Sequence, residues 1–379
     1  METLSSIFFH TVPFIIVLSI LVFVHELGHY LIAKISGVRI ETFSIGFGKE
    51  IFGFNDKSGT RWKFSMLPLG GYVRMFGDAD ETSTGMSSEA KTFTEEEKKV
   101  SFPHQSAAKK LAITVAGPLA NYLFAIFALT VLIATYGKPT VPAIVGSVIE
   151  NSASFEAGIK TGDRIVSIDG REIDNFAKLQ KIVTNSSDKE LSFGIERDGQ
   201  NLEIKMKPRM TEKADKDTGV ITKKPMIGIV SAEMLENNFV VLPLHKAFVS
   251  ALEYTYDINS HTIYSLWQMV TRQKSAEEIG GPIRIAELSA NVATGKKPIP
   301  SMIFFIAVLS INLGLINLLP IPILDGGSIV FYFFEGLRGK PLNEKSQEWL
   351  FRFGFFVILA LMIFATWNDI SRLFSRWSS

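Results

Sequence analysis

The chain has 379 residues, of which 47% are hydrophobic and 20% are charged, and it contains 30 Phe. The apolar content favours a membrane protein, and the charged residues require sizeable aqueous parts. A net charge of +1 gives no indication of nucleic-acid binding, and the absence of Cys excludes thiolate metal ligands, cysteine nucleophiles and disulfides.

The N-terminal region, residues 1–37, is predicted to be a retained transmembrane helix. Its apolar run at 12–35 is accompanied by neither a basic n-region nor a small-residue cleavage site. Within this run, His25 and His29 stand four residues apart and would project from one face of a helix. Two imidazoles so placed can share one Zn²⁺, with Glu26 beside the metal as general base.

The loop at 38–106 alternates apolar and polar residues at 40–48 and 61–66, with a turn-rich stretch at 55–59 between them. This pattern predicts a β-hairpin, which we expect to be associated with the membrane. The loop is rich in Lys and Arg, so the positive-inside rule makes it cytoplasmic. Both termini and the segment 137–300 would then face the outside, with the histidine motif near the cytoplasmic side.

A second transmembrane helix is expected at 107–137, where Asn121 is interpreted as a contact between helices more readily than as a chemical group. Residues 138–225 are predicted to form a small α+β domain. Its expected strands and helix lie at 143–149, 164–168, 191–196, 202–206 and 176–183. Residues 226–300 contain an amphipathic stretch at 244–273, which is typical of a helix on the membrane surface.

Residues 301–379 are predicted to contain the third and fourth transmembrane helices. Asp325 follows the third, and an acid in that position needs a partner such as a cation. Pro320 and Pro322 end the helix and re-aim the chain, and the Gly-Gly pair after Asp325 allows the backbone to approach the metal or the first helix closely. Since the remaining histidines lie outside the predicted spans, Asp325 is the better candidate for a third metal ligand.

The expected fold class is therefore a polytopic α-helical membrane protein with about four transmembrane helices, a membrane-associated β-hairpin loop and an inserted α+β domain. Its motifs occur at 25–29, 68–75, 116–121, 157–165, 280–283, 317–327 and 367–373. Together they resemble the site-2 protease family, most closely its bacterial regulator-of-sigma-E proteases, and the segment 157–165 resembles the core of a PDZ domain. The chain departs from that pattern in having one PDZ-like unit instead of two, and in having Ser328 where many relatives have His.

The resemblance implies a zinc-dependent endopeptidase that cleaves within the transmembrane segment of single-span membrane proteins, in regulated intramembrane proteolysis. Anti-sigma-factor-type proteins and remnant signal peptides are the implied substrates. His25, His29 and Asp325 would bind Zn²⁺. Glu26 would activate the zinc-bound water, and Asn317 would hold substrate or stabilise the oxyanion. An exposed hairpin edge at 43–48 or 61–66 could capture an unwound substrate by strand addition. The substrate-binding candidates are Phe43, Gly46, Phe47, Gly70, Gly71 and Tyr72.

The expected location is the bacterial inner membrane, with the lipid bilayer and protein substrates as partners and no nucleic acid. The PDZ domain would bind a peptide or a C-terminus, or act as a size filter. Two alternatives to the protease are a membrane-anchored PDZ scaffold and a metal transporter. The intact motif at 25–29 with Asp325 argues against the scaffold. A transporter would have no use for Glu26 as a base.

Overall fold

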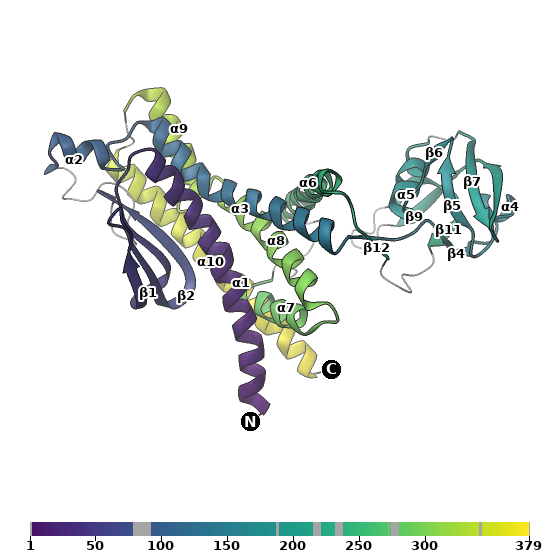
Figure 1. Cartoon of the computed structure of the whole chain (residues 1–379), viewed down its shortest axis with the longest axis horizontal. Helices are drawn as coiled ribbons and strands as arrows, with labels where there is room; N and C mark the ends of the chain where they lie inside the picture. The colour runs from purple at the N-terminus through teal and green to yellow at the C-terminus, as the bar shows by residue number, and fades with distance from the viewer. Residues whose placement is uncertain are drawn as a thin grey trace. The chain divides into compact units, whose positions relative to one another are not determined.

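The computed structural model describes residues 2–78, 92–186, 189–214, 221–231, 238–271, 273, 280–340 and 343–378. The chain divides into two compact units, which are described separately (Figure 1). Unit 1 consists of Met1–Leu132, Leu244–Val270 and Ser275–Ser379, and unit 2 consists of Ile133–Pro243 with Thr271–Lys274.

Unit 1 is mainly helical, with one β-sheet. Its helices are α1 (Glu2–Ile35), α2 (Glu95–Val100), α3 (Ala107–Thr135, which continues into unit 2), α6 (Leu244–Val270), α7 (Pro282–Thr294), α8 (Pro298–Asn317), α9 (Asp325–Arg338) and α10 (Glu344–Ser378). Its strands are β1 (Ile40–Asn55) and β2 (Arg61–Met75).

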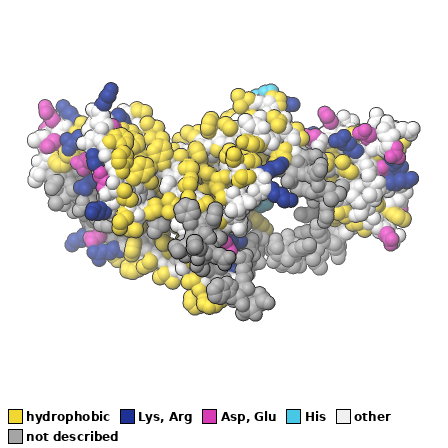
Figure 2. All heavy atoms as spheres, turned by 60° about the horizontal axis from the view of Figure 1, so that its bottom comes forward, with side chains coloured by type: hydrophobic (Ala, Val, Ile, Leu, Met, Phe, Trp, Pro, Cys, Tyr) yellow, Lys and Arg dark blue, Asp and Glu magenta, His cyan; other side chains and the backbone are white. Residues whose placement is uncertain are grey.

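Four helices in the described part of the chain are long and apolar enough to cross a membrane, as the sequence predicts. They cover Thr11–Ile35, Ala107–Thr135, Pro298–Asn317 and Lys345–Arg372. Figure 2 shows hydrophobic side chains spread over the helical unit and charged side chains gathered at its end near α2. An apolar surface of this extent is suited to lipid and would be a liability in water.

Small residues allow α1 and α3 to pack closely. A Cβ on Gly28 of α1 would collide with the backbone oxygen of Ala116 and would lie 2.7 Å from the Cβ of Ala120, both on α3. In lipid, close packing of this kind holds helices together. The hydrophobic effect does not, because lipid tails are as apolar as the helices themselves. On its other side α3 packs against α8, where a Cβ on Gly314 would lie 3.1 Å from the oxygen of Pro118.

The strands β1 and β2 both bend, so that four segments lie side by side in one sheet. Segment 42–45 pairs with 71–75 on one side and with 61–65 on the other, and 61–65 also pairs with 50–55. The outer segments of the sheet are therefore 50–55 and 71–75, and β2 lies against α1.

An aromatic cluster fixes the sheet to α1. Phe43 stacks on Trp62 with ring centroids 4.2 Å apart, and Tyr30 of α1 meets Trp62 edge-on at 5.0 Å. The hydroxyl of Tyr30 donates a hydrogen bond to Asp56 Oδ2 at 2.8 Å, beside the turn between the strands. Buried aromatic pairs of this kind contribute about 0.5–1.5 kcal/mol each beyond their buried area, so the sheet is held at a defined place on α1.

Unit 2 contains a four-stranded sheet in the order β6-β5-β7-β8. Its elements are β3 (Lys138–Thr140), β4 (Val145–Val148), α4 (Ala153–Glu156), β5 (Arg164–Ile168), β6 (Arg171–Glu172), α5 (Phe176–Thr184), β7 (Leu191–Arg197), β8 (Gln200–Met206), β9 (Arg209–Ala214), β10 (Ile221–Met226), β11 (Ile229–Ser231) and β12 (Asn238–Val240). Ile165, Phe193 and Ile195 form its fully buried centre. The unit extends to Pro243, beyond the 138–225 range expected for the inserted domain.

Candidate active site

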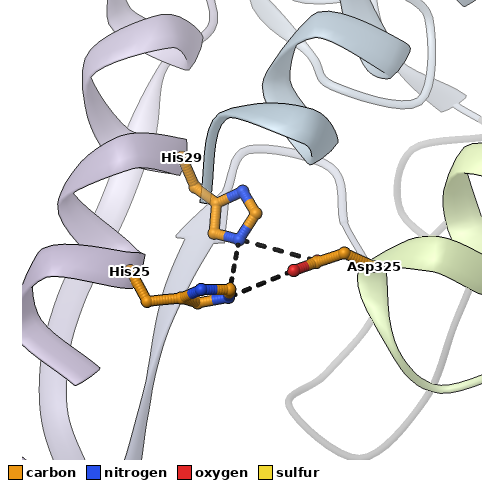
Figure 3. A group of neighbouring side chains, drawn as sticks. All are labelled: His25, His29 and Asp325. Atoms are coloured by element: carbon orange, nitrogen blue, oxygen red, sulfur yellow. Dashed lines mark hydrogen bonds and ion pairs between the residues drawn. The ribbon is translucent and has the colours of Figure 1, made fainter. Parts of the chain in front are cut away.

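Three side chains from two distant segments converge in unit 1. His25 and His29 come from successive turns of α1, and Asp325 is the first residue of α9 (Figure 3). The two Nε2 atoms lie 3.2 Å apart, His25 Nε2 lies 3.1 Å from Asp325 Oδ2, and His29 Nε2 lies 3.5 Å from Asp325 Oδ1. These are the three residues that the sequence predicts as metal ligands, and their donor atoms face a common point.

The spacing of these atoms fits a metal ion. Ligand atoms about 2.1 Å from a tetrahedral Zn²⁺ lie about 3.4 Å from one another. The contacts of 3.1–3.5 Å that join the two Nε2 atoms and the two Asp325 oxygens are close to this separation, and one ligand atom from each residue lies within 4.8 Å of the others. Asp325 Oδ2 is buried and makes no hydrogen bond with any described residue, although it lies opposite His25 Nε2. A buried carboxylate oxygen in that state is costly unless a cation satisfies it. The donor set of two imidazoles and one carboxylate is typical of catalytic zinc.

A backbone carbonyl of α3 determines the tautomer of His29. Its Nδ1 lies 2.8 Å from the oxygen of Ile113, and a carbonyl oxygen only accepts hydrogen bonds. His29 Nδ1 therefore carries the proton, which leaves a lone pair on Nε2 directed at the site. Gly117 of α3 leaves room for this ring, since a Cβ there would lie directly against Nε2 and 2.5 Å from Cε1 of His29.

A strained loop delivers Asp325. Ile323 has a φ of 114°, which is a rare conformation for a β-branched residue and is usually retained only where function requires it. The two glycines after Asp325 allow this loop to pack closely against the start of α9. A Cβ on Gly326 would lie 2.5 Å from the carbonyl carbon of Leu318, and one on Gly327 would lie 2.5 Å from the oxygen of Ile321. The nearest neighbours of both glycines thus lie in the preceding loop, a close approach that the sequence did not predict.

Glu26 lies beside the three converging side chains and next to the outer segment 71–75 of the sheet. The backbone N–H of Val73 on this segment lies near the carboxyl group of Glu26. A Cβ on Gly71 would lie 3.3 Å from Glu26 Cγ and 2.5 Å from Val22 Cγ1, so Gly71 allows the strand to pass directly over α1 at this point. The carboxyl group that the sequence predicts as general base therefore lies against β2.

The predicted substrate-binding residues have different environments. Phe43 is 1% exposed within the aromatic cluster, so its ring is unavailable to a ligand. Phe47 is 37% exposed and stacks on Tyr72 with centroids 6.0 Å apart. Gly46 and Gly70 both have positive φ and lie where the strands bend.

The register of the sheet also corrects the predicted edges. Segments 42–45 and 61–65 are each paired on both sides, which leaves them unable to accept a further strand. Among the strands that the structure describes, none pairs with the outer side of 71–75, the segment beside Glu26. Gly71, which the family resemblance suggests as a substrate-binding residue, therefore lies on the accessible edge. The segments that the alternating pattern predicted as edges do not.

Asn317 is the last residue of α8 and is half-buried, eight positions before Asp325. His245 and His261 both lie on α6 and are not among the residues that converge with His25.

Two groups of the site were missed from the sequence: the Ile113 carbonyl was not assigned to it, and Asn121 was interpreted as a packing residue. Asn121 is fully buried, and its side-chain nitrogen lies 3.0 Å from His25 Nδ1. The sequence did contain a signal for this role, because a polar side chain in the middle of an apolar helix is usually functional.

Two histidines and an aspartate that converge among membrane-length helices, with a glutamate alongside, define a metal-dependent hydrolase of the membrane. The chain belongs to peptidase family M50, whose model matches residues 13–361. A protein of Agrobacterium fabrum named as a zinc metalloprotease is 42% identical over 366 residues, which are 96% of each chain. Metalloprotease MmpA of Caulobacter vibrioides is 34% identical over 381 residues, which cover 95% of each chain.

One solved structure, the PDZ domain of an SdrC-like protein from Listeria innocua, covers 26% of this chain and 99% of its own, at 21% identity and a TM-score of 0.20. A score of this size is too low to assign a fold. The family and the curated relatives make the chain a zinc-dependent metalloendopeptidase of the site-2 protease family. With four membrane-length helices, it works in a lipid environment on protein substrates.

Proposed function

We propose that His25, His29 and Asp325 hold the catalytic zinc and that the enzyme hydrolyses a peptide bond within the transmembrane segment of a single-span protein. The observation that carries this proposal is the convergence of three side chains, with 3.1–3.5 Å between their nitrogen and oxygen atoms and one ligand atom from each within 4.8 Å of the others. Two of them lie within an apolar helix of membrane length. A site assembled there would act on a substrate in the bilayer.

Zinc held by His25, His29 and Asp325 would supply a Lewis acid, able to activate water and to polarise the scissile carbonyl. Glu26 takes a proton from the attacking water and passes it to the leaving amide nitrogen, which is the task of a general base that becomes a general acid. The close passage of Gly71 over α1 confines the Glu26 side chain for this transfer. Asn317, at the end of α8, holds substrate or stabilises the oxyanion.

The outer segment 71–75 binds the substrate by strand addition. A helical peptide bond is shielded by its own hydrogen bonds, so a substrate must be unwound before it can be cleaved. An extended substrate paired with Gly71 would pass the carboxyl group of Glu26. Gly70, Tyr72 and Phe47 would shape the end of this track, where Phe47 and Tyr72 stack.

The loop that contains the sheet faces the cytoplasm, and unit 2 is a PDZ domain on the opposite side, where it binds a peptide or a C-terminus or acts as a size filter. The physiological substrates are anti-sigma-factor-type proteins or remnant signal peptides, as for the regulator-of-sigma-E proteases. Because the chain contains no Cys, Lys57→Cys and Asn201→Cys would each carry the only thiol for a membrane-impermeant reagent. Labelling of both from the same side would contradict this orientation.

The test of the activity is cleavage of a single-span substrate by purified protein in detergent, with wild type, Glu26→Gln and a chelator-treated sample. Glu26→Gln should retain one zinc per chain and lose at least about 100-fold in rate, as expected for removal of a general base. Glu172→Gln, at an exposed position of unit 2, is the matched control. Full activity of Glu26→Gln would overturn the assignment, and zinc flux in vesicles without cleavage would favour a transporter.

A further inference from the structure

We infer that Asn121 is the positioning residue for His25: its amide oxygen accepts a hydrogen bond from His25 Nδ1–H and so presents Nε2 to the metal. This inference rests on the proposed zinc site. It assigns a role in metal binding to a residue that supplies no metal ligand.

The position of Asn121 is the first argument. Its side chain is fully buried in α3, and the structure places its amide nitrogen 3.0 Å from His25 Nδ1. The hydroxyl of Ser310 on α8 donates a hydrogen bond to its backbone oxygen at 2.9 Å. Asn121 is therefore held between two helices, with its amide against the ring of a metal ligand.

The chemistry of histidine determines which way the amide must face. A neutral imidazole that offers the Nε2 lone pair to a metal carries its proton on Nδ1, and that proton needs an acceptor. The nitrogen and oxygen of an Asn amide are distinguished only by their hydrogen bonds, so the hydrogen bonds decide which of the two faces the ring. In the orientation drawn, Asn121 Oδ1 is buried without a hydrogen-bond partner among the described residues. Turning the amide over gives the oxygen a donor and His25 the tautomer that zinc requires.

The arrangement around His29 supports the same conclusion independently. Its Nδ1 is held by the Ile113 carbonyl, which can act only as an acceptor. Ile113 and Asn121 are eight residues apart on α3 and therefore lie on one face of that helix. One face of α3 thus supplies an acceptor to each of the two histidines, and both rings direct Nε2 to the same point.

The test compares Asn121→Leu, which removes the acceptor at similar volume, with Asn121→Asp, which keeps an acceptor and has no donor when ionised. Chelator competition on the purified full chain measures zinc affinity directly. Asn121→Leu should bind zinc about 10–100-fold more weakly, the usual cost of losing a group that orients a metal-bound histidine. Asn121→Asp should bind zinc at least as tightly as wild type. Thr130→Val, a buried change on the same helix, should leave the affinity unchanged.

A second measurement separates positioning from packing. For each variant the melting temperature is recorded with and without zinc, because zinc stabilises the fold in proportion to its affinity. A residue that only packs would lower the zinc-free melting temperature and leave the zinc-induced increment unchanged. That result for Asn121→Leu, or loss of zinc from folded Asn121→Asp, would overturn the inference. If Asn121→Leu does not fold, Asn121→Asp alone decides. Failure of wild type to bind zinc would instead refute the proposed site.

Discussion

Replacing Gly117 by Ala tests whether α3 determines the position of His29. The new Cβ would lie 2.5 Å from His29 Cε1, whereas ordinary contact begins at 3.4 Å, so the ring must move by about an ångström. Metal–ligand distances tolerate only about 0.2 Å. We therefore expect zinc affinity to fall at least about 100-fold, the upper end of losses seen when the surroundings of a ligand are changed.

The same substitution should not weaken the helix itself, since Ala is better than Gly in a helix interior by about 0.5–1 kcal/mol. Zinc affinity is measured by chelator competition and stoichiometry by elemental analysis. Gly336→Ala in α9 is the matched control, because its Cβ would meet only Ala107 Cβ at 3.5 Å. An affinity of Gly117→Ala within about threefold of wild type would refute the reasoning that this glycine makes room for a zinc ligand.

Three further predictions concern other parts of the chain. Asp325→Ala should lose zinc, and full metal occupancy measured by elemental analysis would mean that another residue is the third ligand. Lys110→Met should destabilise the fold by about 3 kcal/mol in denaturant unfolding, the lower end for a buried ion pair, because it leaves the partly buried Glu335 without its partner at 2.8 Å; adding Glu335→Gln should restore most of that loss. In unit 2, burial raises the pKa of Asp163, but the hydrogen bonds from Arg197 and from the Lys160 N–H, together with the positive charges of both residues, lower it by more in sum, so the net shift is downward. The stabilisation is therefore complete above about pH 4 and is lost as the pH falls through the lowered pKa. Amide protection in unit 2, taken relative to the intrinsic exchange rate at each pH, should fall below pH 4 in wild type, and Asp163→Asn should be destabilised at pH 7 and lack that fall.

Periodicity and composition predicted the elements of this protein well. The four apolar stretches are helices of membrane length, and the strands expected at 164–168 and 191–196 are present as β5 and β7. His25, His29 and Asp325 were predicted together because acids and imidazoles in apolar segments have few roles other than binding a cation. These inferences succeeded because each depends on residues that are local in sequence or chemically unusual where they occur.

The contacts between distant segments were not predictable in the same way. Alternation identified strands in 40–48 and 61–66, but both strands bend, and the pairing between their halves makes the predicted edges internal. The close approach of Gly117 to His29 depends on the relative rotation of α1 and α3, which no local pattern specifies. The prediction that Asn121 is packing missed its contact with His25 for the same reason.

The face of α3 toward α1 and α9 unites these observations. Lys110, Ile113, Gly117 and Asn121 follow one another at spacings of three or four residues and so lie along one side of the helix. Lys110 pairs with Glu335 of α9, the helix that begins with Asp325, while the next three contact the rings of His29 and His25. A helix that provides no metal ligand thus touches every element that does. Changes on this face should alter zinc affinity, whereas changes at Leu123, which is 60% exposed, should alter only how the helix meets lipid.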